Sequence, residues 1–324
     1  MASRVLKTAC AGYLCIAVLL FLNSGALAFD KRASVALSHY ILGQIYEDTL
    51  NIDSAIQEYK QAQRLDKENS LIYLSLASSY IKKNDIPRAI EALKLAEKLD
   101  PEAIEPHAIL ALLYSSQDKP DLAASEYEKA LKGSSKLQPK NVEIYKSLGA
   151  VYLQQKRFED AKQAYKLILD LAPDDAEAHF YLGSIHNELK DNELSKKELR
   201  RAIELKPDYH QALNFLGYVY VEENSNLDEA EGMIKKALEL EPNNGAYIDS
   251  LGWLYYKKAN YKEALKELER ASALVEDPVI FDHLGDAYFK LEEPQKAKEN
   301  WQKSLKLDAK QENVKKKLEG TNAI

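Results

Sequence analysis

Residues 142–175 read VEIYKSLGAVYLQQKRFEDAKQAYKLILDLAPDD, and this stretch predicts two consecutive helices. In its first half, marked residues are spaced i, i+3, i+4 and i+7, which is one face of an α-helix. These residues are Tyr145, Leu148, Gly149 and Tyr152. In its second half, Ala161, Tyr165 and Ile168 follow an i, i+4, i+7 spacing. Pro173 then prevents the second helix from continuing, so a new element must begin after it.

The same pattern returns eight times, and a leucine followed by Gly or Ala marks each copy. The pairs are Leu42-Gly43, Leu76-Ala77, Leu110-Ala111, Leu148-Gly149, Leu182-Gly183, Leu216-Gly217, Leu251-Gly252 and Leu284-Gly285. A period near 34 residues is typical of a helical solenoid, in which each unit buries its apolar face by stacking on its neighbours. The predicted units are 36–69, 70–103, 104–141, 142–175, 176–209, 210–244, 245–277 and 278–311, followed by a capping helix and tail over 312–324.

The first 28 residues differ from the rest of the chain. Two basic residues precede an apolar run over residues 9–22, and Ala26 and Ala28 then occupy the positions of a signal cleavage site. We therefore expect a signal peptide over residues 1–28, cleavage after Ala28 and export to the periplasm. The alternative is a retained inner-membrane anchor, although the apolar run is shorter than the roughly 20 residues that a spanning helix needs.

Charge and cysteine usage narrow the classes of partner. Cys10 and Cys15 are the two cysteines of the chain, so cleavage after Ala28 leaves no disulfide and no thiol chemistry. The net charge is −7, and it falls to −9 on cleavage because the first 28 residues carry two positive charges and no negative one. An acidic protein is poorly suited to nucleic acid or to an anionic membrane surface. We expect a protein partner.

Two irregularities interrupt the repeat. Residues 132–138 add four residues between the third and fourth units, and their Gly and Ser content predicts a lengthened loop. This insertion is either a surface bulge on a continuous stack or a hinge. The sixth unit carries one extra residue at 224–226, which predicts a longer turn between its helices. In the capping helix, Val314 and Leu318 are expected to face inward and Lys315–Lys317 outward.

Motifs for catalysis or cofactor binding are missing from the sequence. There is no G-x-G-x-x-G, no P-loop and no H-E-x-x-H, and carboxylates alternate with lysines at helical spacing, as on a solvated face. His39, His107 and His179 occupy the same position of their units and are expected to pack between helices. We therefore expect no enzyme activity, no cofactor and no metal.

The repeat resembles the tetratricopeptide repeat (TPR) over essentially the whole chain after the signal. Positions are counted from the first residue of each unit, so that Leu148 is position 7 of the fourth unit. The shared residues are Leu and a small residue at positions 7 and 8, Tyr at 11, Ala at 20 and 27, an aromatic at 24 and Pro at 32. The resemblance implies an all-α, right-handed superhelical solenoid of about eight helix-turn-helix repeats with a C-terminal capping helix. It also implies that positions 2, 5, 9, 12 and 13 of each first helix line a concave binding surface.

Those positions place aromatic and acidic residues in the last four units. The expected partner-binding residues are Phe180, Asn214, Tyr218, Asp249, Trp253, Tyr256, Asp286 and Phe289. Aromatic anchors beside carboxylates suit a protein segment that carries apolar and basic side chains, with Trp253 as the central anchor. The alternative is that these rings pack on the adjacent unit.

Residues 210–310 further resemble the C-terminal repeats of bacterial envelope TPR lipoproteins, one of which is an adaptor for a periplasmic protease. The resemblance rests on the stretches LNFLGY (213–218), LEPNNGAYIDSLGW (240–253) and HLGDAY (283–288). The chain differs from those lipoproteins in having no lipobox. The resemblance implies an exported scaffold or adaptor that binds a protein, such as an envelope protease or assembly machinery. The alternatives are a membrane-tethered structural TPR protein and a glycan-binding envelope protein.

Overall fold

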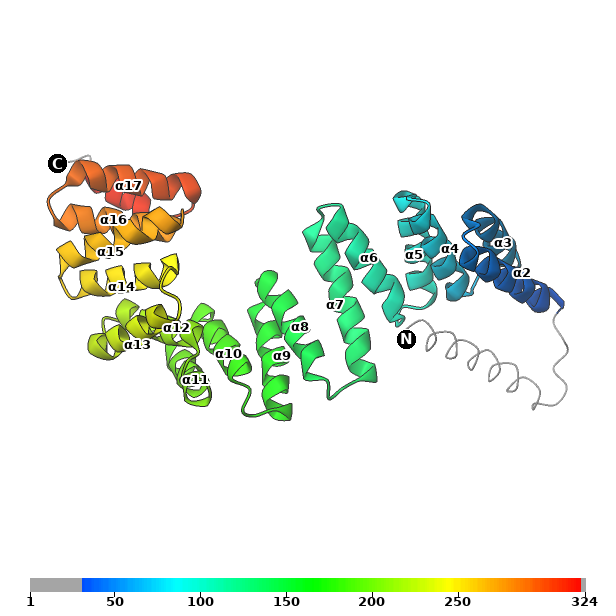
Figure 1. Ribbon diagram of the computed structural model, residues 1–324, viewed down its shortest axis with the longest axis horizontal. Coiled ribbons are helices and arrows are strands. Elements are labelled where there is room, and N and C mark those ends of the chain that lie inside the picture. Colours follow the sequence, from blue (N-terminus) through cyan, green and yellow to red (C-terminus); the bar gives the residue numbers. More distant parts are fainter. Residues whose placement is uncertain (1–30, 322–324) are drawn as a thin grey trace. The chain divides into compact units, whose positions relative to one another are not determined.

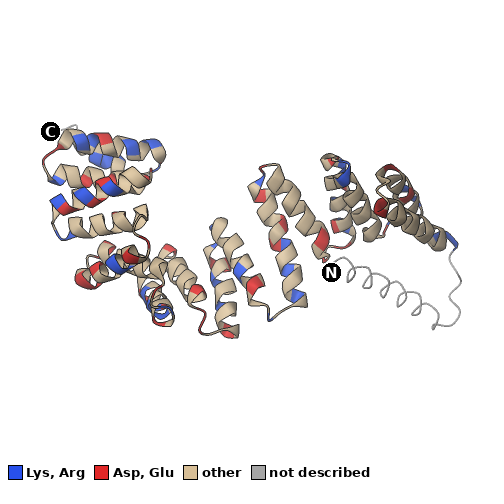
Figure 2. Cartoon of the chain, viewed as in Figure 1, with Lys and Arg blue, Asp and Glu red and all other residues tan. Residues whose placement is uncertain are grey.

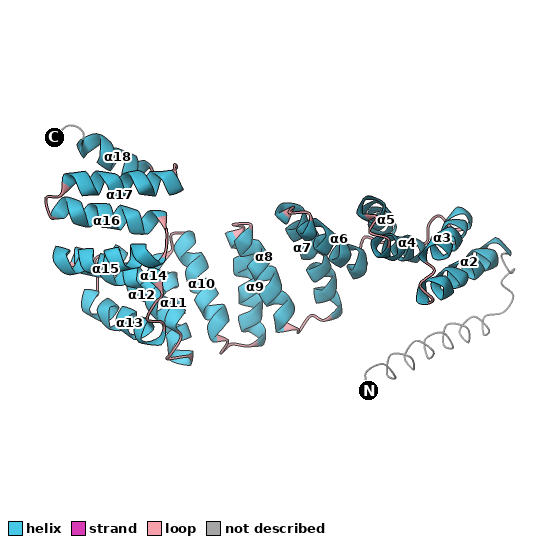
Figure 3. Cartoon of the chain, turned by 45° about the horizontal axis from the view of Figure 1, so that its top comes forward, coloured by secondary structure: helices cyan, strands magenta, loops and turns pink. Residues whose placement is uncertain are grey.

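The computed structural model describes residues 31–321, and within them every regular element is a helix (Figure 1, Figure 3). The expectation of an all-α fold is therefore confirmed. The predicted signal peptide lies outside the described residues. None of the helices in the described range is long and apolar enough to cross a membrane.

Each predicted unit contains two helices. The first helices are α2 (Lys31–Asp48), α4 (Ser70–Lys82), α6 (Ile104–Ser116), α8 (Val142–Gln154), α10 (Ala176–Glu188), α12 (His210–Glu222), α14 (Gly245–Lys257) and α16 (Pro278–Lys290). The second helices are α3 (Ile52–Leu65), α5 (Ile86–Leu99), α7 (Pro120–Leu137), α9 (Phe158–Leu171), α11 (Asn192–Leu205), α13 (Leu227–Leu240), α15 (Tyr261–Leu274) and α17 (Pro294–Leu307). A single helix, α18 (Glu312–Thr321), follows the last pair.

The described residues form two compact parts, which meet in the sequence between Gly133 and Ser134, inside α7. Within each part, a second helix packs both on the first helix of its own unit and on the first helix of the next unit. The contacts α2–α3 and α3–α4 show this in the N-terminal part, and α14–α15 and α15–α16 show it in the C-terminal part. Stacking of neighbours is thus what buries the apolar faces.

A close approach between the two helices of a unit explains the small residue at position 8. A Cβ added to Gly149 would lie 2.6 Å from the ring of Tyr165, sixteen residues later. At Gly285 the added atom would lie 2.5 Å from the ring of Trp301. These bulky side chains are 1–2% exposed. One large side chain of the second helix therefore packs directly against the small residue of the first.

Helix ends are set by short polar sequences. The side chain of Asp175 accepts a hydrogen bond from the backbone N–H of Ala178 at 2.9 Å and so caps the start of α10. Three residues separate α10 from α11, and one of them, Lys190, has a positive φ of 64°. In the sixth unit the turn has four residues, 223–226, as the extra residue predicted.

The lengthened loop predicted over residues 132–138 is wrong. Most of the insertion continues α7, which is 18 residues long where the other second helices have 14. Four residues add about one turn to an α-helix, so the insertion can be accommodated by lengthening α7. Gly133 lies inside this helix. The helix continues through Gly133 although glycine has a low helix propensity.

The close approach predicts opposite effects for two Gly→Ala substitutions. Gly285→Ala should lower the free energy of unfolding by about 1–3 kcal/mol, because the new methyl group overlaps Trp301. Gly232→Ala, in α13, should raise it by about 0.5–1 kcal/mol, because nothing lies within 4 Å of the added atom and alanine favours a helix. Urea unfolding of both variants tests this. Equal effects would contradict the packing described here.

Candidate protein-binding site

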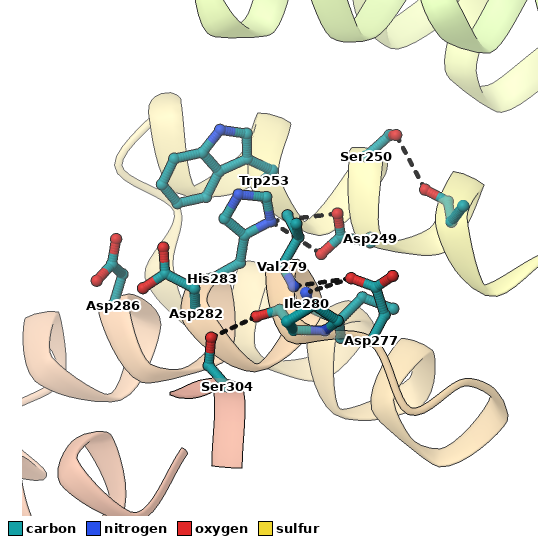
Figure 4. Close-up of polar contacts among 12 residues, drawn as sticks. Asp249, Ser250, Trp253, Asp277, Val279, Ile280, Asp282, His283, Asp286 and Ser304 are labelled. Carbon is teal, nitrogen blue, oxygen red and sulfur yellow. Dashed lines mark hydrogen bonds and ion pairs between the residues drawn. The ribbon is translucent and has the colours of Figure 1, made fainter. Parts of the chain in front are cut away.

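Three of the predicted binding residues of the last two units, Asp249, Trp253 and Asp286, lie around a buried histidine (Figure 4). Nδ1 of His283, on α16, lies 2.9 and 3.2 Å from the two carboxylate oxygens of Asp249, on α14. Burial alone would lower the pKa of His283, but the charge of Asp249 and the hydrogen bond to it raise the pKa above its usual value. The two helices are therefore joined by a buried, charge-assisted contact.

Trp253 covers this pair. Its ring stacks on His283 with centroids 4.0 Å apart and planes at 9°, and on Tyr256 with centroids 4.5 Å apart. The indole Nε1 donates a hydrogen bond to Glu222, at the end of α12, at 2.6 Å. The side chain of Trp253 thus connects the first helices of three successive units, and only 8% of the residue is exposed.

The capping helix α18 reaches the same surface. Nζ of Lys317 lies 2.6 Å from Asp282 and 2.8 Å from Asp286, both on α16. The expectation that Lys317 faces outward is therefore wrong, because two carboxylates draw its ammonium group onto α16. Val314 is buried and Leu318 packs against the same apolar cluster, as predicted.

The carboxylate of Asp286 is partly buried, and this burial disfavours its charged form. Burial raises its pKa above the usual value, and the neighbouring Asp282 raises it further, while Lys317 opposes both. The indole Nε1 of Trp301 also donates a hydrogen bond to Asp286, at 3.1 Å. We name Glu222, Asp249, Trp253, Tyr256, Asp282, His283, Asp286 and Lys317 the aromatic-acidic cluster.

The remaining predicted residues extend from this cluster in both directions. Tyr218 and Asn214 lie on α12, where burial raises the pKa of Tyr218 and the Asn214 side-chain oxygen is buried without a hydrogen-bond partner. Burial also raises the pKa of Tyr256 to about 12. Phe289 ends α16 and is 41% exposed. Phe180, on α10, packs on Tyr209 and lies away from the cluster.

Four members of the cluster were not predicted as binding residues: Glu222, Asp282, His283 and Lys317. A signal for the last three of them exists in the sequence. Asp249 and His283 are one repeat apart, as are Asp282 and Lys317, so oppositely charged residues recur at the repeat period. A search for such pairs would have found both contacts.

Another charged cluster lies in the N-terminal part. Single ligand atoms of Glu97, His107 and Glu126 lie within 4.8 Å of one another, an arrangement that could hold a metal ion. The ammonium group of Lys129 lies 2.7 Å from Glu97 and 3.1 Å from Glu126 and offsets part of their charge. The same His–Glu contact joins His179 and Glu198 at 2.6 Å, so it serves helix packing. The absence of a metal remains an expectation.

Comparison with known families agrees with this architecture. Three family models, each described as tetratricopeptide repeat, match residues 51–113, residues 110–176 with 155–195, and residues 185–315. The chain belongs to the tetratricopeptide repeat family. Proteins of this family are generally scaffolds that bind other proteins.

A curated relative is the type IV pilus assembly protein PilF of Pseudomonas aeruginosa, 32% identical over 91 residues. The match covers 28% of this chain and 34% of PilF, about a third of its length. A TPR protein from Parabacteroides merdae has a TM-score of 0.58 at 19% identity, covering 78% of this chain and 98% of its own. The Cut9–Hcn1 hetero-tetramer structure also has a TM-score of 0.58, at 18% identity, covering 83% of this chain and 52% of that chain. Both structures show the fold alone.

The His283–Asp249 contact predicts a pH-dependent contribution to stability. Because the pKa of His283 is raised on folding, the contribution is complete below the unfolded pKa of about 6.5 and is lost as pH rises through the folded pKa. The difference in melting temperature between the natural protein and Asp249→Asn should therefore be largest near pH 6 and shrink towards pH 9. Calorimetry across this range tests it. A difference that grows with pH would contradict the assignment.

Trp253→Ala should lower the free energy of unfolding by about 3–5 kcal/mol, because the ring is buried and links three helices. Trp253→Phe keeps an aromatic ring but leaves Glu222 without its donor, so we expect a smaller loss, of about 1–3 kcal/mol. Chemical unfolding measures both. Losses below 1 kcal/mol for both variants would show that the ring is dispensable for packing.

Proposed function

We propose that this protein is an exported TPR scaffold or adaptor that binds another protein in the bacterial cell envelope. The TPR family supports protein binding, and the signal-like residues 1–28 support export. The name of the relative PilF, a pilus assembly protein, favours envelope assembly machinery as the class of partner. The proposal includes no enzyme activity and no cofactor.

The contact of Lys317 with Asp282 and Asp286 is the main structural support for the proposal. It shows that a helix of this chain, α18, can bind to the first helix α16 by placing a lysine between two carboxylates. A partner segment with the same chemistry would compete for these carboxylates or extend along the neighbouring first helices. Phe289, which is 41% exposed one turn beyond Asp286, offers apolar contact beside them. We therefore expect the partner to present basic and apolar side chains on one segment.

Electrostatics support the same class of partner. Glu222, Asp249, Asp282 and Asp286 bring four acidic residues to one cluster, while His283 and Lys317 supply its basic groups. A basic segment is thus favoured over an acidic one, both in the rate of encounter and in the bound state. Salt should slow the encounter with a basic segment, because it screens the field of the cluster outside the protein surface.

Two substitutions should change partner binding in opposite directions. Phe289→Ala should weaken it about tenfold, because an exposed apolar contact is lost. Lys317→Ala should strengthen it, because Asp282 and Asp286 are released for the partner. The partner is first captured from envelope extract with the tagged protein and identified by mass spectrometry, and its affinity is then measured by calorimetry.

The control is Glu239→Ala, on the exposed side of α13, which should leave affinity unchanged. All variants are compared at equal folded fraction by circular dichroism. If Phe289→Ala and Lys317→Ala both bind like the control, the partner uses another surface and the proposed site is wrong. If no protein is enriched over an unrelated TPR bait, the scaffold function itself is contradicted.

A further inference from the structure

The first described helix, α2, exposes side chains at positions where every other unit buries them. Leu42 is 42% exposed, whereas the leucine at the same position of the other seven units is at most 7% exposed. Ile45 is 52% exposed, whereas its counterparts, Leu254 among them, are at most 8% exposed. In the second, third and fifth to eighth units, the first helix packs on the preceding second helix. Among the described residues, α2 has no preceding helix to pack on.

The exposed side chains form a regular stripe along α2. Val35, Ser38, Leu42 and Ile45 are separated by three, four and three residues, and all four are exposed. This is the alternating spacing of the seam of a coiled coil, in which two helices pack along their length. Leu37 and Ile41 flank the stripe and are 57% and 40% exposed. The surface is therefore suited to one more helix.

The charges of α2 indicate which helix would fit. The sequence of α2 begins with Lys31-Arg32 and ends with Glu47-Asp48, and no Lys, Arg, Asp or Glu lies between them (Figure 2). Lys31 and Asp48 are exposed. A second α2 packed antiparallel would place each Lys31 near the Asp48 of the other copy, twice by symmetry. A parallel arrangement would place like charges together.

The opposite end of the chain does not offer such a surface. There, α18 covers α17, buries Val314 and presents the charged side chains of Lys316 and Glu319 to solvent. A polar outer face is the usual way in which a solenoid ends. End-to-end stacking of α2 on α18 of another copy would bury those charges, so pairing of like ends is favoured.

We propose that α2 is a self-association surface, on which a second copy of this chain packs its own α2 antiparallel about a two-fold axis. The stripe from Val35 to Ile45 forms the apolar centre, and the two Lys31–Asp48 contacts close its ends. A helix of 18 residues is about 27 Å long. Two such helices bury less than the roughly 1,200 Å² of a standard interface, so the dimer should dissociate in the micromolar range.

Sedimentation equilibrium and light scattering on the full chain, from about 1 to 100 μM, test the proposal. We expect the mass to rise from one to two copies over this range. Leu42→Glu with Ile45→Glu should remain monomeric throughout and keep its helical circular dichroism. The matched control is Leu112→Glu, on α6, which alters a leucine that is 71% exposed and should dimerise like the natural protein.

Charge reversal tests the antiparallel arrangement itself. Lys31→Glu and Asp48→Lys should each weaken the dimer about threefold to tenfold, because each creates two like-charge contacts. The two changes combined in one chain should restore the natural affinity. Three results would overturn the proposal: a monomer up to 100 μM, which would mean that residues 1–30 or another protein covers α2; a dimer that survives the two glutamates; or charge reversals without mutual rescue.

Discussion

Contact between a small residue on the first helix and a bulky side chain on the second is the constraint on which every unit depends. Gly149 meets Tyr165, and Gly285 meets Trp301, with no space for even a methyl group between them. This contact brings the two backbones close enough for one layer of side chains to fill the unit. It recurs at an offset of sixteen residues, or of seventeen in the sixth unit, where Gly217 meets Ile234, and so it sets the register of the two helices.

Because no unit encloses a core of its own, residues at the ends and between units carry special roles. The leucine of position 7 is buried when a preceding unit is present and exposed in α2, where the described chain offers none. At the other end, α18 supplies Val314 and Leu318 to cover the last pair. The same apolar position is thus a packing residue in seven units and a surface residue in one. Neighbour contacts, and not residue type, decide which.

Sequence periodicity predicted the all-α fold and the pairing of helices within a repeat, because both depend on residues at most a few turns apart. It failed over residues 132–138, where Gly and Ser indicated a loop while helical continuity kept α7 intact. The site was harder to predict. Trp253 was predicted from its position to be the central anchor for a partner, and its surroundings could not be predicted, because Glu222 and His283 come from two other units. Contacts between residues about 34 positions apart are not visible in the short helical spacings from which the elements were predicted.

Those contacts suggest how a uniform fold acquires a particular binding surface. At three places a side chain at the sixth position of a helix lies against the fifth position of the preceding unit: Ser75 meets Tyr40, His283 meets Asp249, and Lys317 of the capping helix meets Asp282. Backbone geometry therefore fixes which side chains meet, while their chemistry remains free to vary. In the last units these positions hold acids, aromatic rings and their basic partners. The charge that would select a ligand is consequently the same charge that ties the helices together, so binding and stability in this region are linked through shared carboxylates.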